Sequence, residues 1–289
     1  MNTHRHCGLT AEVVDRTETI LDPARRPVRV ISEARAGDAA RQSGSSLGQA
    51  YIAALEAGIW PLRYVRNAGN LSTGDQLTLA RSHVAIIGAG GLGAHIATTA
   101  ARMGIGSMTI ADPDVYEESN LNRQILATSG TLGANKAETA RNVLATVNPA
   151  VNVTACPVRL TTENAAEILA GANVAADALD SIPDRMTLTR ACKARDIPLI
   201  HAAVAGFEGQ VMTIYPQDDG LAALYGEGAA SCPDGTPEAT LGVAAVTPAL
   251  VAALQVMEIV KVLLNRGTVL RNRMLYIDLE YASFQQLSL

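Results

Sequence analysis

The chain has 289 residues and a mass of 30.2 kDa, enough for one α/β domain with appendages or for two small domains. Hydrophobic residues make up 48% and charged residues 18%, which predicts a packed globule; because aromatics reach only 3%, its core should be aliphatic. The formal net charge of -5, without basic clusters beside aromatic residues, argues against nucleic acid as the main partner.

The apolar runs predict neither a membrane span nor a signal peptide. The longest runs, such as Val243 to Leu254, fall short of the roughly 20 residues that a span needs. The N-terminus carries Arg5, Glu12 and Asp15 where a signal peptide would be apolar. We therefore expect a cytoplasmic protein. No cysteine pair has C-x-x-C spacing, so we expect neither a disulfide framework nor a zinc site from Cys7, Cys156, Cys192 and Cys232.

Residues 1–60 show weak periodicity and are expected to form an N-terminal extension, partly helical or mobile, with one helix over Leu47 to Ala57. From Ser82 onward, apolar strands alternate with amphipathic helices, which predicts a mostly parallel α/β sheet with helices on both faces. The helices are expected to open near Gly91, Ala134, Thr162 and Pro183. The predicted strands are His83 to Ile87, Met108 to Ala111, Val151 to Ala155, Val174 to Ala178 and Leu199 to Ala202.

The pattern changes after Ala202 and predicts an antiparallel extension of the sheet. We expect strands at Gln210 to Tyr215, Arg273 to Asp278 and Ser283 to Leu287, a long loop over Pro216 to Thr240, and a helix over Pro248 to Leu264.

The run VAIIGAGGLG places Gly88, Gly90 and Gly93 in G-x-G-x-x-G spacing between a strand and a helix. Glycines let the backbone approach phosphates, and a helix N-terminus offers unpaired N–H groups to an anion. This context predicts a nucleotide site, although such turns also serve packing. Asp112 ends the second strand, where it can accept hydrogen bonds from ribose or act as an ordinary turn aspartate. Neither feature separates ATP from NAD.

The stretch SNLNRQ then places Asn120, Arg123 and Gln124 in one loop, with Lys136 at the start of the next helix. Cationic and amide donors on one side of a phosphate site suit a triphosphate that loses pyrophosphate, while the alternative is a solvated loop. Asp180 ends the fourth strand and should face the same crevice, where it either binds magnesium or caps the following helix. Asp177 and His201 are expected to be structural.

Together these residues resemble the ThiF/MoeB/HesA superfamily of ubiquitin-activating-enzyme-like adenylyltransferases. The resemblance covers Pro61 to Leu289 and rests on GAGGLG, SNLNRQ, GANKAE, VNP, ALDS, EGQ and LQVMEIVKVLL in order. It implies an adenylation domain over residues 61–289, with a nucleotide-binding half at 82–205 and a C-terminal sheet with crossover loop at 206–289.

The resemblance also implies site roles: Asp112 for ribose, and Asp180 for magnesium. The phosphates would be surrounded by Gly88, Gly90, Gly91, Gly93, Asn120, Arg123, Gln124 and Lys136. RYVRN at Arg63 to Asn67 resembles the family's Arg-Tyr-x-Arg element, which makes Arg66 the residue expected to reach the partner subunit's site in a homodimer.

The activity implied is ATP-dependent activation of the C-terminal carboxylate of a ubiquitin-like sulfur-carrier protein ending in Gly-Gly, as in thiamine or molybdopterin biosynthesis. Many relatives hold zinc with two C-x-x-C pairs, which this chain lacks; Cys232 lies in the crossover loop, where some relatives keep a covalently reacting cysteine. The residues leave open a tRNA-borne or peptide carboxylate, an NAD-dependent oxidoreductase, and an inactive nucleotide-binding subunit.

Overall fold

The structure is a computed structural model that describes residues 2–226 and 240–289. The chain divides into two compact units. The first comprises Met1–Ser82 with Ala101–Ser107 and Ala145–Asn152, and the second comprises His83–Ala100, Met108–Leu144 and Val153–Leu289. The expected boundary after residue 60 therefore falls inside the first unit.

The first unit combines helices with a three-stranded sheet in the order β1-β2-β3, in which β1 and β2 form an antiparallel hairpin. Helix α3 covers Leu47–Glu56 and confirms the helix expected there; Ser46 and Gln49 cap it reciprocally. Its elements are α1 (Asn2–Asp15), β1 (Glu18–Leu21), β2 (Pro27–Ile31), α2 (Glu33–Ser43), α3, β3 (Trp60–Pro61), the 3-10 helix η1 (Leu62–Asn67) and α4 (Thr73–Arg81).

A core of its own holds this unit together. Alanines on α2 and α3 pack with Val30, Ile31, Trp60 and Tyr64, all buried. Residues 1–60 thus form packed structure around an apolar core, with strands β1 and β2 in addition to the helix that the sequence predicted.

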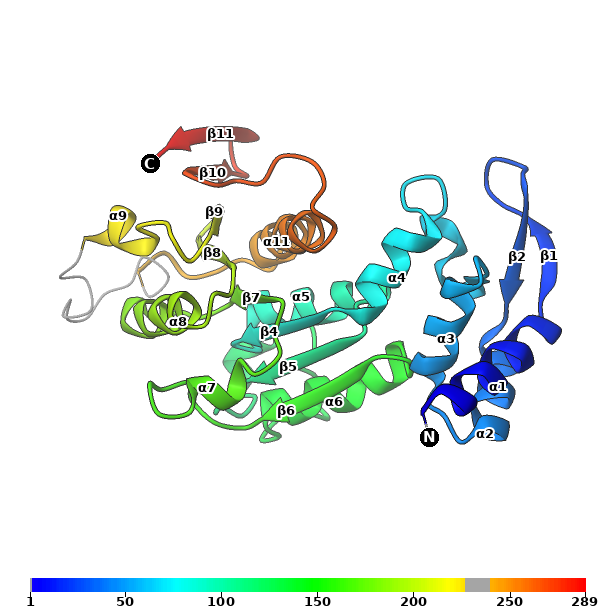
Figure 1. The fold of residues 1–289 in the computed structure, drawn as a ribbon. Helices are drawn as coiled ribbons and strands as arrows, with labels where there is room; N and C mark the ends of the chain where they lie inside the picture. The colour runs from blue at the N-terminus through cyan, green and yellow to red at the C-terminus, as the bar shows by residue number, and fades with distance from the viewer. Residues whose placement is uncertain (1, 227–239) are drawn as a thin grey trace. The chain divides into compact units, whose positions relative to one another are not determined.

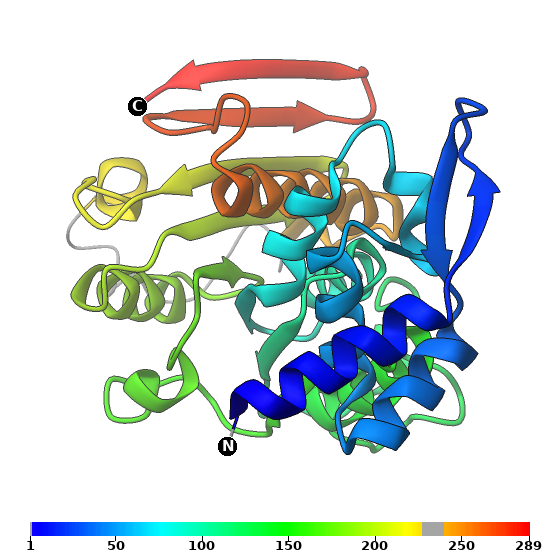
Figure 2. The same cartoon turned by 45° about the vertical axis from the view of Figure 1, so that its right-hand side comes forward.

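The second unit is built on an eight-stranded sheet in the order β11-β10-β9-β8-β7-β4-β5-β6. Strands β4, β7 and β8 pair in parallel, whereas β8, β9, β10 and β11 pair antiparallel, as the sequence predicted. The β10–β11 hairpin forms the outermost edge (Figure 2). The strands are β4 (His83–Ile87), β5 (Ser107–Ala111), β6 (Asn152–Cys156), β7 (Val174–Asp177), β8 (Leu199–Ala205), β9 (Glu208–Ile214), β10 (Arg273–Asp278) and β11 (Ser283–Ser288).

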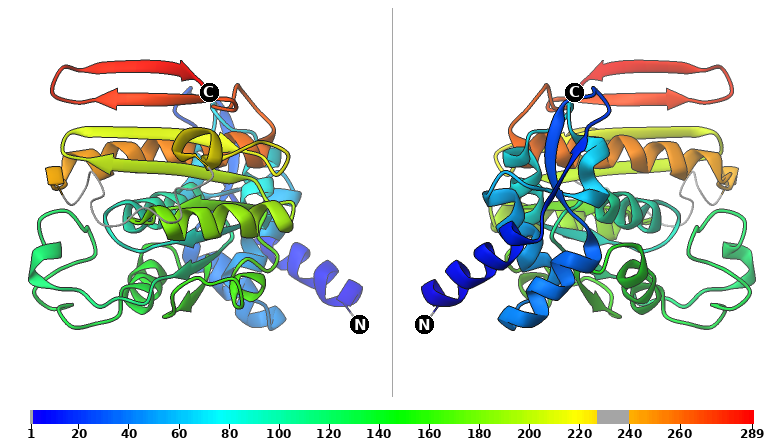
Figure 3. Two further views of the ribbon diagram at one scale, coloured as in Figure 1. Left: turned by 90° about the vertical axis from the view of Figure 1, so that its left-hand side faces the viewer. Right: turned by 90° about the vertical axis from the view of Figure 1, so that its right-hand side faces the viewer.

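Helices cover both faces of this sheet: α8 and α11 lie on opposite sides of it (Figures 1 and 3). The helices are α5 (Gly91–Met103), η2 (Glu118–Asn120), α6 (Lys136–Val147), α7 (Ala165–Ile168), α8 (Ile182–Ala194), α9 (Leu221–Tyr225) and α11 (Val246–Leu264). The short helix α9 falls within the segment that the sequence predicted to be a loop.

Helix α11 has the length and apolar composition of a membrane span, with a mean hydropathy of 1.7 in its most apolar window. This differs from the expectation that every apolar run is too short. Val251, Gln255 and Ile259 are buried, and the helix packs on β7, β8 and β9. Those contacts are the setting of a core helix that covers one face of the sheet.

Candidate active site

The turn between β4 and α5 requires glycine at two positions. Gly88 has φ of +99°, and a Cβ added there would lie 2.4 Å from the carbonyl oxygen of Ala178. A Cβ added at Gly93 would lie 1.9 Å from the carbonyl oxygen of Gly88. The turn therefore packs backbone against backbone, and the N-terminus of α5 is left facing the space beyond the strands.

The carboxyl ends of four strands meet at this turn. The Gly88 N–H donates to Ala111 O at 2.8 Å, the Asp112 N–H to Cys156 O at 3.1 Å, and the Ala178 N–H to Ile87 O at 2.9 Å. A cavity of about 740 Å³ opens beside them. The predicted site residues that line it are Gly88, Gly90, Gly91, Asp112, Arg123, Gln124, Lys136 and Asp180.

Asp112 is 5% exposed and braces the glycine turn. One carboxylate oxygen accepts from the Ala89 N–H at 2.6 Å, and the other accepts from the Asp114 N–H at 2.8 Å. Burial raises the pKa of Asp112, while these two N–H groups and Lys136 oppose that rise. Each carboxylate oxygen can accept a further hydrogen bond, which leaves capacity for ribose hydroxyls.

Three donors line the cavity from the loop after β5 and from α6. Lys136 is 7% exposed, and its Nζ lies 2.9 Å from the Asp114 carboxylate, an ion pair that orients the ammonium. Arg123 lines the cavity, and its Nη1 donates to Ser119 O at 3.0 Å. Gln124 is buried directly against Gly90, and its Oε1 has no hydrogen-bond partner among the described residues.

Asp180 is exposed and lines the cavity. The N-cap of α8 is Ser181, whose Oγ accepts from the Asp184 N–H, so Asp180 does not serve as the helix cap. The helix-cap alternative for Asp180 is therefore wrong, and a role in binding magnesium stays a prediction.

Other predicted residues are not gathered in this cavity. The buried Asn120 side chain accepts from the Glu117 N–H at 3.1 Å and so shapes the loop from within. Gly93 packs inside the first turn of α5. Arg66 is exposed on η1 in the first unit, and Cys232 lies outside the described residues.

Sequence reasoning missed several residues that line the cavity. Asn122, which belongs to the SNLNRQ stretch but was given no role of its own, also lines it. Arg159 pairs with Asp184 through its Nε and Nη2 atoms, and the shortest of these contacts is 2.8 Å. Both residues line the cavity. Arg185 is 3% exposed. Single charged residues on loops or a helix carry no periodic signal, so only their meeting in space identifies them.

The cavity suits a nucleoside triphosphate with a metal ion. The buried, unpaired Gln124 Oε1 and the helix N-terminus supply polar groups for a ligand, and the volume lies in the range of small-molecule sites. Four cations and four carboxylates share its walls: Arg123, Lys136, Arg159, Arg185, and Asp112, Asp114, Asp180, Asp184. No group of three or more His, Cys, Asp or Glu residues suited to a metal occurs in residues 2–226 and 240–289. Magnesium bound through phosphates needs only one or two carboxylates.

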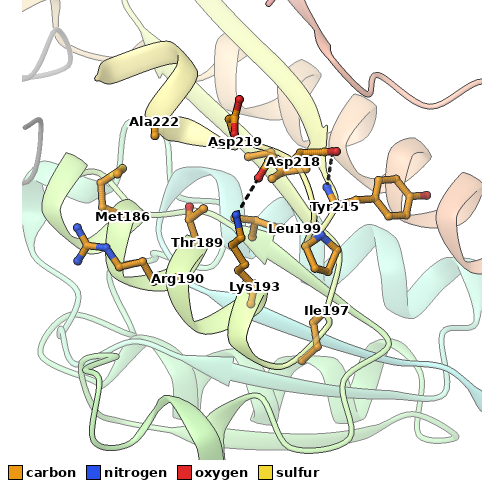
Figure 4. A pocket seen from close by; sticks show the side chains of 13 residues that line it. Met186, Thr189, Arg190, Lys193, Ile197, Leu199, Tyr215, Asp218, Asp219 and Ala222 are labelled. Atoms are coloured by element: carbon orange, nitrogen blue, oxygen red, sulfur yellow. Dashed lines mark hydrogen bonds between the residues drawn. The ribbon is translucent and has the colours of Figure 1, made fainter. Parts of the chain in front are cut away.

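Two further cavities lie in the second unit. One of about 310 Å³ lies between α8 and the turn after β9, and Lys193, Tyr215 and Asp218 face it (Figure 4). None of the predicted site residues lines it. The other, of about 180 Å³, shares Arg185 and Val204 with the large cavity and continues along β8 and β9.

The described cysteines are poorly suited to nucleophilic chemistry. Cys192 is 2% exposed, and burial raises its pKa to about 12, as expected of a core thiol. Burial also raises the pKa of Cys156. A covalent role for Cys232 stays a prediction.

Comparison with known proteins identifies the family of this chain. Residues 64–289 match the ThiF family. The SAMP-activating enzyme E1 of Haloferax volcanii is 38% identical over 208 residues, which cover 72% of this chain and 76% of that protein. The sulfur carrier protein adenylyltransferase of Thermus thermophilus is 37% identical, with coverages of 74% and 80%. The molybdopterin-synthase adenylyltransferase of Escherichia coli is 31% identical, with coverages of 74% and 86%.

Solved structures agree on the fold. The E. coli MccB structure with MccA-N7isoASN superposes with a TM-score of 0.67 at 20% identity, over 78% of this chain and 72% of that one. At that identity the likeness shows the fold alone. Because the family match extends from residue 64 to residue 289 and these relatives exceed 30% identity, this chain belongs to the ThiF family.

Proposed function

We propose that this chain is an ATP-dependent adenylyltransferase that activates the C-terminal carboxylate of a ubiquitin-like sulfur-carrier protein. The observation that carries the proposal is the convergence of the glycine turn, Arg123, Lys136 and Asp180 on one cavity. The relatives from Thermus thermophilus and Escherichia coli, a sulfur carrier protein adenylyltransferase and a molybdopterin-synthase adenylyltransferase, support it. Cations grouped beside the glycine turn suit a triphosphate that loses pyrophosphate better than the unreactive pyrophosphate of NAD.

In the proposed reaction, a carboxylate oxygen of the carrier attacks the α-phosphorus of ATP, and the bond from that phosphorus to the bridging oxygen breaks. Pyrophosphate leaves with the electron pair, and an acyl-adenylate forms. The attacking group is already ionised at neutral pH, so no general base is needed. Arg123 and Lys136 offset the charge that develops on the departing phosphates. Asp180 would hold magnesium, which supplies further charge neutralisation when bound.

The small cavity gives the carboxylate a route to this site. It is lined by Ala203, Gly209 and Tyr276 among others, and it meets the large cavity at Arg185 and Val204. A chain end of two glycines has no side chains to obstruct such a passage. We therefore propose that a Gly-Gly tail extends along β8 and β9 toward the nucleotide. We also propose a cytoplasmic homodimer, in which Arg66 completes the partner's site.

Carrier-dependent exchange of labelled pyrophosphate into ATP tests this function. Small candidate carriers ending in Gly-Gly are compared with the same carriers lacking the last residue. Exchange should require the intact carrier and should vanish in Asp180→Ala and Arg123→Ala. Asp219→Ala and Arg190→Ala are matched controls, because those exposed residues line a different cavity.

The other outcomes separate the alternatives. Exchange supported by a peptide or by tRNA alone would move the proposal to another carboxylate. ATP binding without exchange by any acceptor would indicate an inactive subunit, and hydride transfer to bound NAD⁺ would replace the proposal altogether.

A further inference from the structure

A buried polar network lies beneath the loop that carries Asp180. Asp177, at the end of β7, and His201, on β8, are both fully buried. Asp177 Oδ2 lies 2.7 Å from His201 Nδ1 and 3.9 Å from Arg185 Nε. Neither Asp177 nor His201 lines the cavity, so neither can touch a nucleotide there.

The network fixes both peptide groups of Leu179, the residue just before Asp180. The Leu179 N–H donates to Asp177 Oδ1 at 3.0 Å. The Leu179 carbonyl oxygen accepts from Arg185 through Nε at 3.2 Å and through Nη2 at 2.6 Å. The backbone entering Asp180 is therefore clamped from two sides, by a carboxylate and by a guanidinium that are themselves adjacent.

His201 sets the orientation of the Asp177 carboxylate. Gln210 Nε2 lies 3.2 Å from His201 Nε2 and 2.9 Å from Tyr225 Oη, so its two protons serve both neighbours. His201 Nε2 then accepts, and Nδ1–H donates to Asp177. On the far side, Gln255 Nε2 donates to Asp177 O at 2.7 Å and to Ile200 O at 2.8 Å, which ties β7 to β8.

Burying charged and polar groups in such a network costs free energy that a core of apolar residues would not. Burying a carboxylate is unfavourable unless it is paired and hydrogen-bonded, and apolar residues of the same volume stabilise a core at least as well. In return, Asp177 and its neighbour Arg185 both hydrogen-bond the backbone of Leu179. The network thus orders the loop before Asp180 more tightly than a solvated turn could be ordered.

We propose that Asp177 and His201 are positioning residues that hold Asp180 for divalent metal bound with the nucleotide. The inference rests on the proposed function in one respect, the role of Asp180. Groups that orient a metal ligand through hydrogen bonds have measurable effects, roughly 10- to 100-fold on metal affinity when they are removed.

Two variants at one position separate the hydrogen bond from the packing. In His201→Asn, the amide nitrogen can replace Nδ1 and still donate to Asp177. In His201→Leu, a side chain of similar bulk has no donor. Asp177→Asn is a second test, since it keeps an oxygen to accept from Leu179 but loses the charge.

The measurement is calorimetric binding of a non-hydrolysable ATP analogue to the full chain at a series of Mg²⁺ concentrations, with thermal unfolding followed in parallel. For His201→Leu and Asp177→Asn, we expect the Mg²⁺ concentration at half-saturation to rise about tenfold or more. His201→Asn should stay within about twofold of wild type, and binding without metal should be the same for all four proteins.

Coupling to Asp180 is tested in a double variant. Asp180→Asn should itself raise the Mg²⁺ requirement, and adding His201→Leu should raise it no further, because both changes remove the same interaction. Additive effects, or a lower melting temperature of His201→Leu with an unchanged Mg²⁺ requirement, would overturn the proposal and assign the network to stability alone. If the wild-type chain binds no ATP analogue, the proposed function fails instead.

Discussion

Gly88 and Gly133 both have positive φ, +99° and +79°, but they differ in the space around them. A Cβ on Gly88 would meet Ala178 O at 2.4 Å, whereas a Cβ on Gly133 would meet nothing within 4 Å. Gly133→Ala should therefore cost only the left-handed backbone strain, roughly 1–2 kcal/mol in the free energy of unfolding. Gly88→Ala must also displace the carbonyl oxygen of Ala178, which lies against the glycine turn.

We expect Gly88→Ala to be the less stable variant and to lose binding of an ATP analogue, measured by denaturant unfolding and calorimetry. Gly133→Ala is the matched control for positive φ and should bind normally. Equal stabilities, or normal binding by Gly88→Ala, would contradict the close approach that the structure shows.

Lys136 supplies a cation whose place is set by Asp114. Lys136→Met keeps the stem but removes the charge, and we expect pyrophosphate exchange to fall about 100-fold, the usual effect of losing one donor at a developing charge. Lys193→Met is the control, because the same change removes an exposed ammonium that lines a different cavity. Exchange that is insensitive to Lys136→Met would remove this residue from the phosphate site.

At the residue scale, the sequence predicted those site residues that belong to contiguous motifs. Gly88, Asp112, Arg123 and Lys136 lie at strand ends or helix starts, where topology alone directs them to one crevice. The sequence could not show that Asn120 turns inward. In the sequence, an asparagine that hydrogen-bonds its own loop cannot be distinguished from an asparagine that faces a ligand.

At the element scale, a clamp ties the turn after β9 to the segment before β10. Asp218 accepts from Arg271 Nη2 at 2.7 Å, and the Arg271 guanidinium lies 4.8 Å from the centre of the Tyr215 ring. Burial acts to raise the pKa of Asp218, but the Arg271 side chain and the Tyr215 N–H outweigh it and lower that pKa below 3.8. These contacts join two stretches of the chain that are more than 50 residues apart in the sequence.

The lowered pKa fixes the sign of a pH effect. A carboxylate whose pKa is lower in the folded state contributes stability above its ordinary pKa and loses that contribution as the pH falls through the folded value. Relative to Arg271→Gln, the wild-type chain should gain stability at pH 7 and lose that advantage below about pH 3.8. Urea unfolding of both proteins at several pH values measures the difference; an advantage that persists at low pH would exclude Asp218 as its source.

Among the elements, two strands of the large sheet have the bounds that the sequence predicted. β4 and β10 have the expected bounds because apolar runs end at Gly88 and at the acidic end of β10. The β1–β2 hairpin was missed because both strands are short, Arg29 interrupts the apolar residues of β2, and the pairing depends on a turn at Arg25, where φ is +63° without a glycine. Such a turn has no strong sequence signal.

At the scale of the whole molecule, the division into units could not be predicted from a boundary along the chain. The first unit includes two short segments from the middle of the sequence. Asn148 Nδ2 donates to Tyr64 Oη and to Ala101 O, both at 2.7 Å, and so joins three separate stretches. Contacts of this kind are long-range and leave no periodic pattern, whereas composition did predict an aliphatic core.

The homodimer prediction depends on which of two neighbouring arginines is available. Arg63 is engaged within its own unit, since it pairs with Glu33 at 2.6 Å and donates to Val147 O at 3.2 Å, whereas Arg66 is exposed. If Arg66 serves the partner's site, Arg66→Ala and Asp180→Ala should each be inactive alone. Co-expressed, they should recover about a quarter of wild-type exchange, because half of the dimers are mixed and each has one intact site.

The control is a chain with both substitutions, co-expressed with wild type. A mixed dimer then has two sites with one lesion each, so its activity should come from pure wild-type dimers alone, again about a quarter of the total. If Arg66 instead acts within its own subunit, Arg66→Ala mixed with Asp180→Ala recovers nothing, while the control mixture retains about half. The ratio of the two mixtures thus decides whether one subunit completes the site of the other.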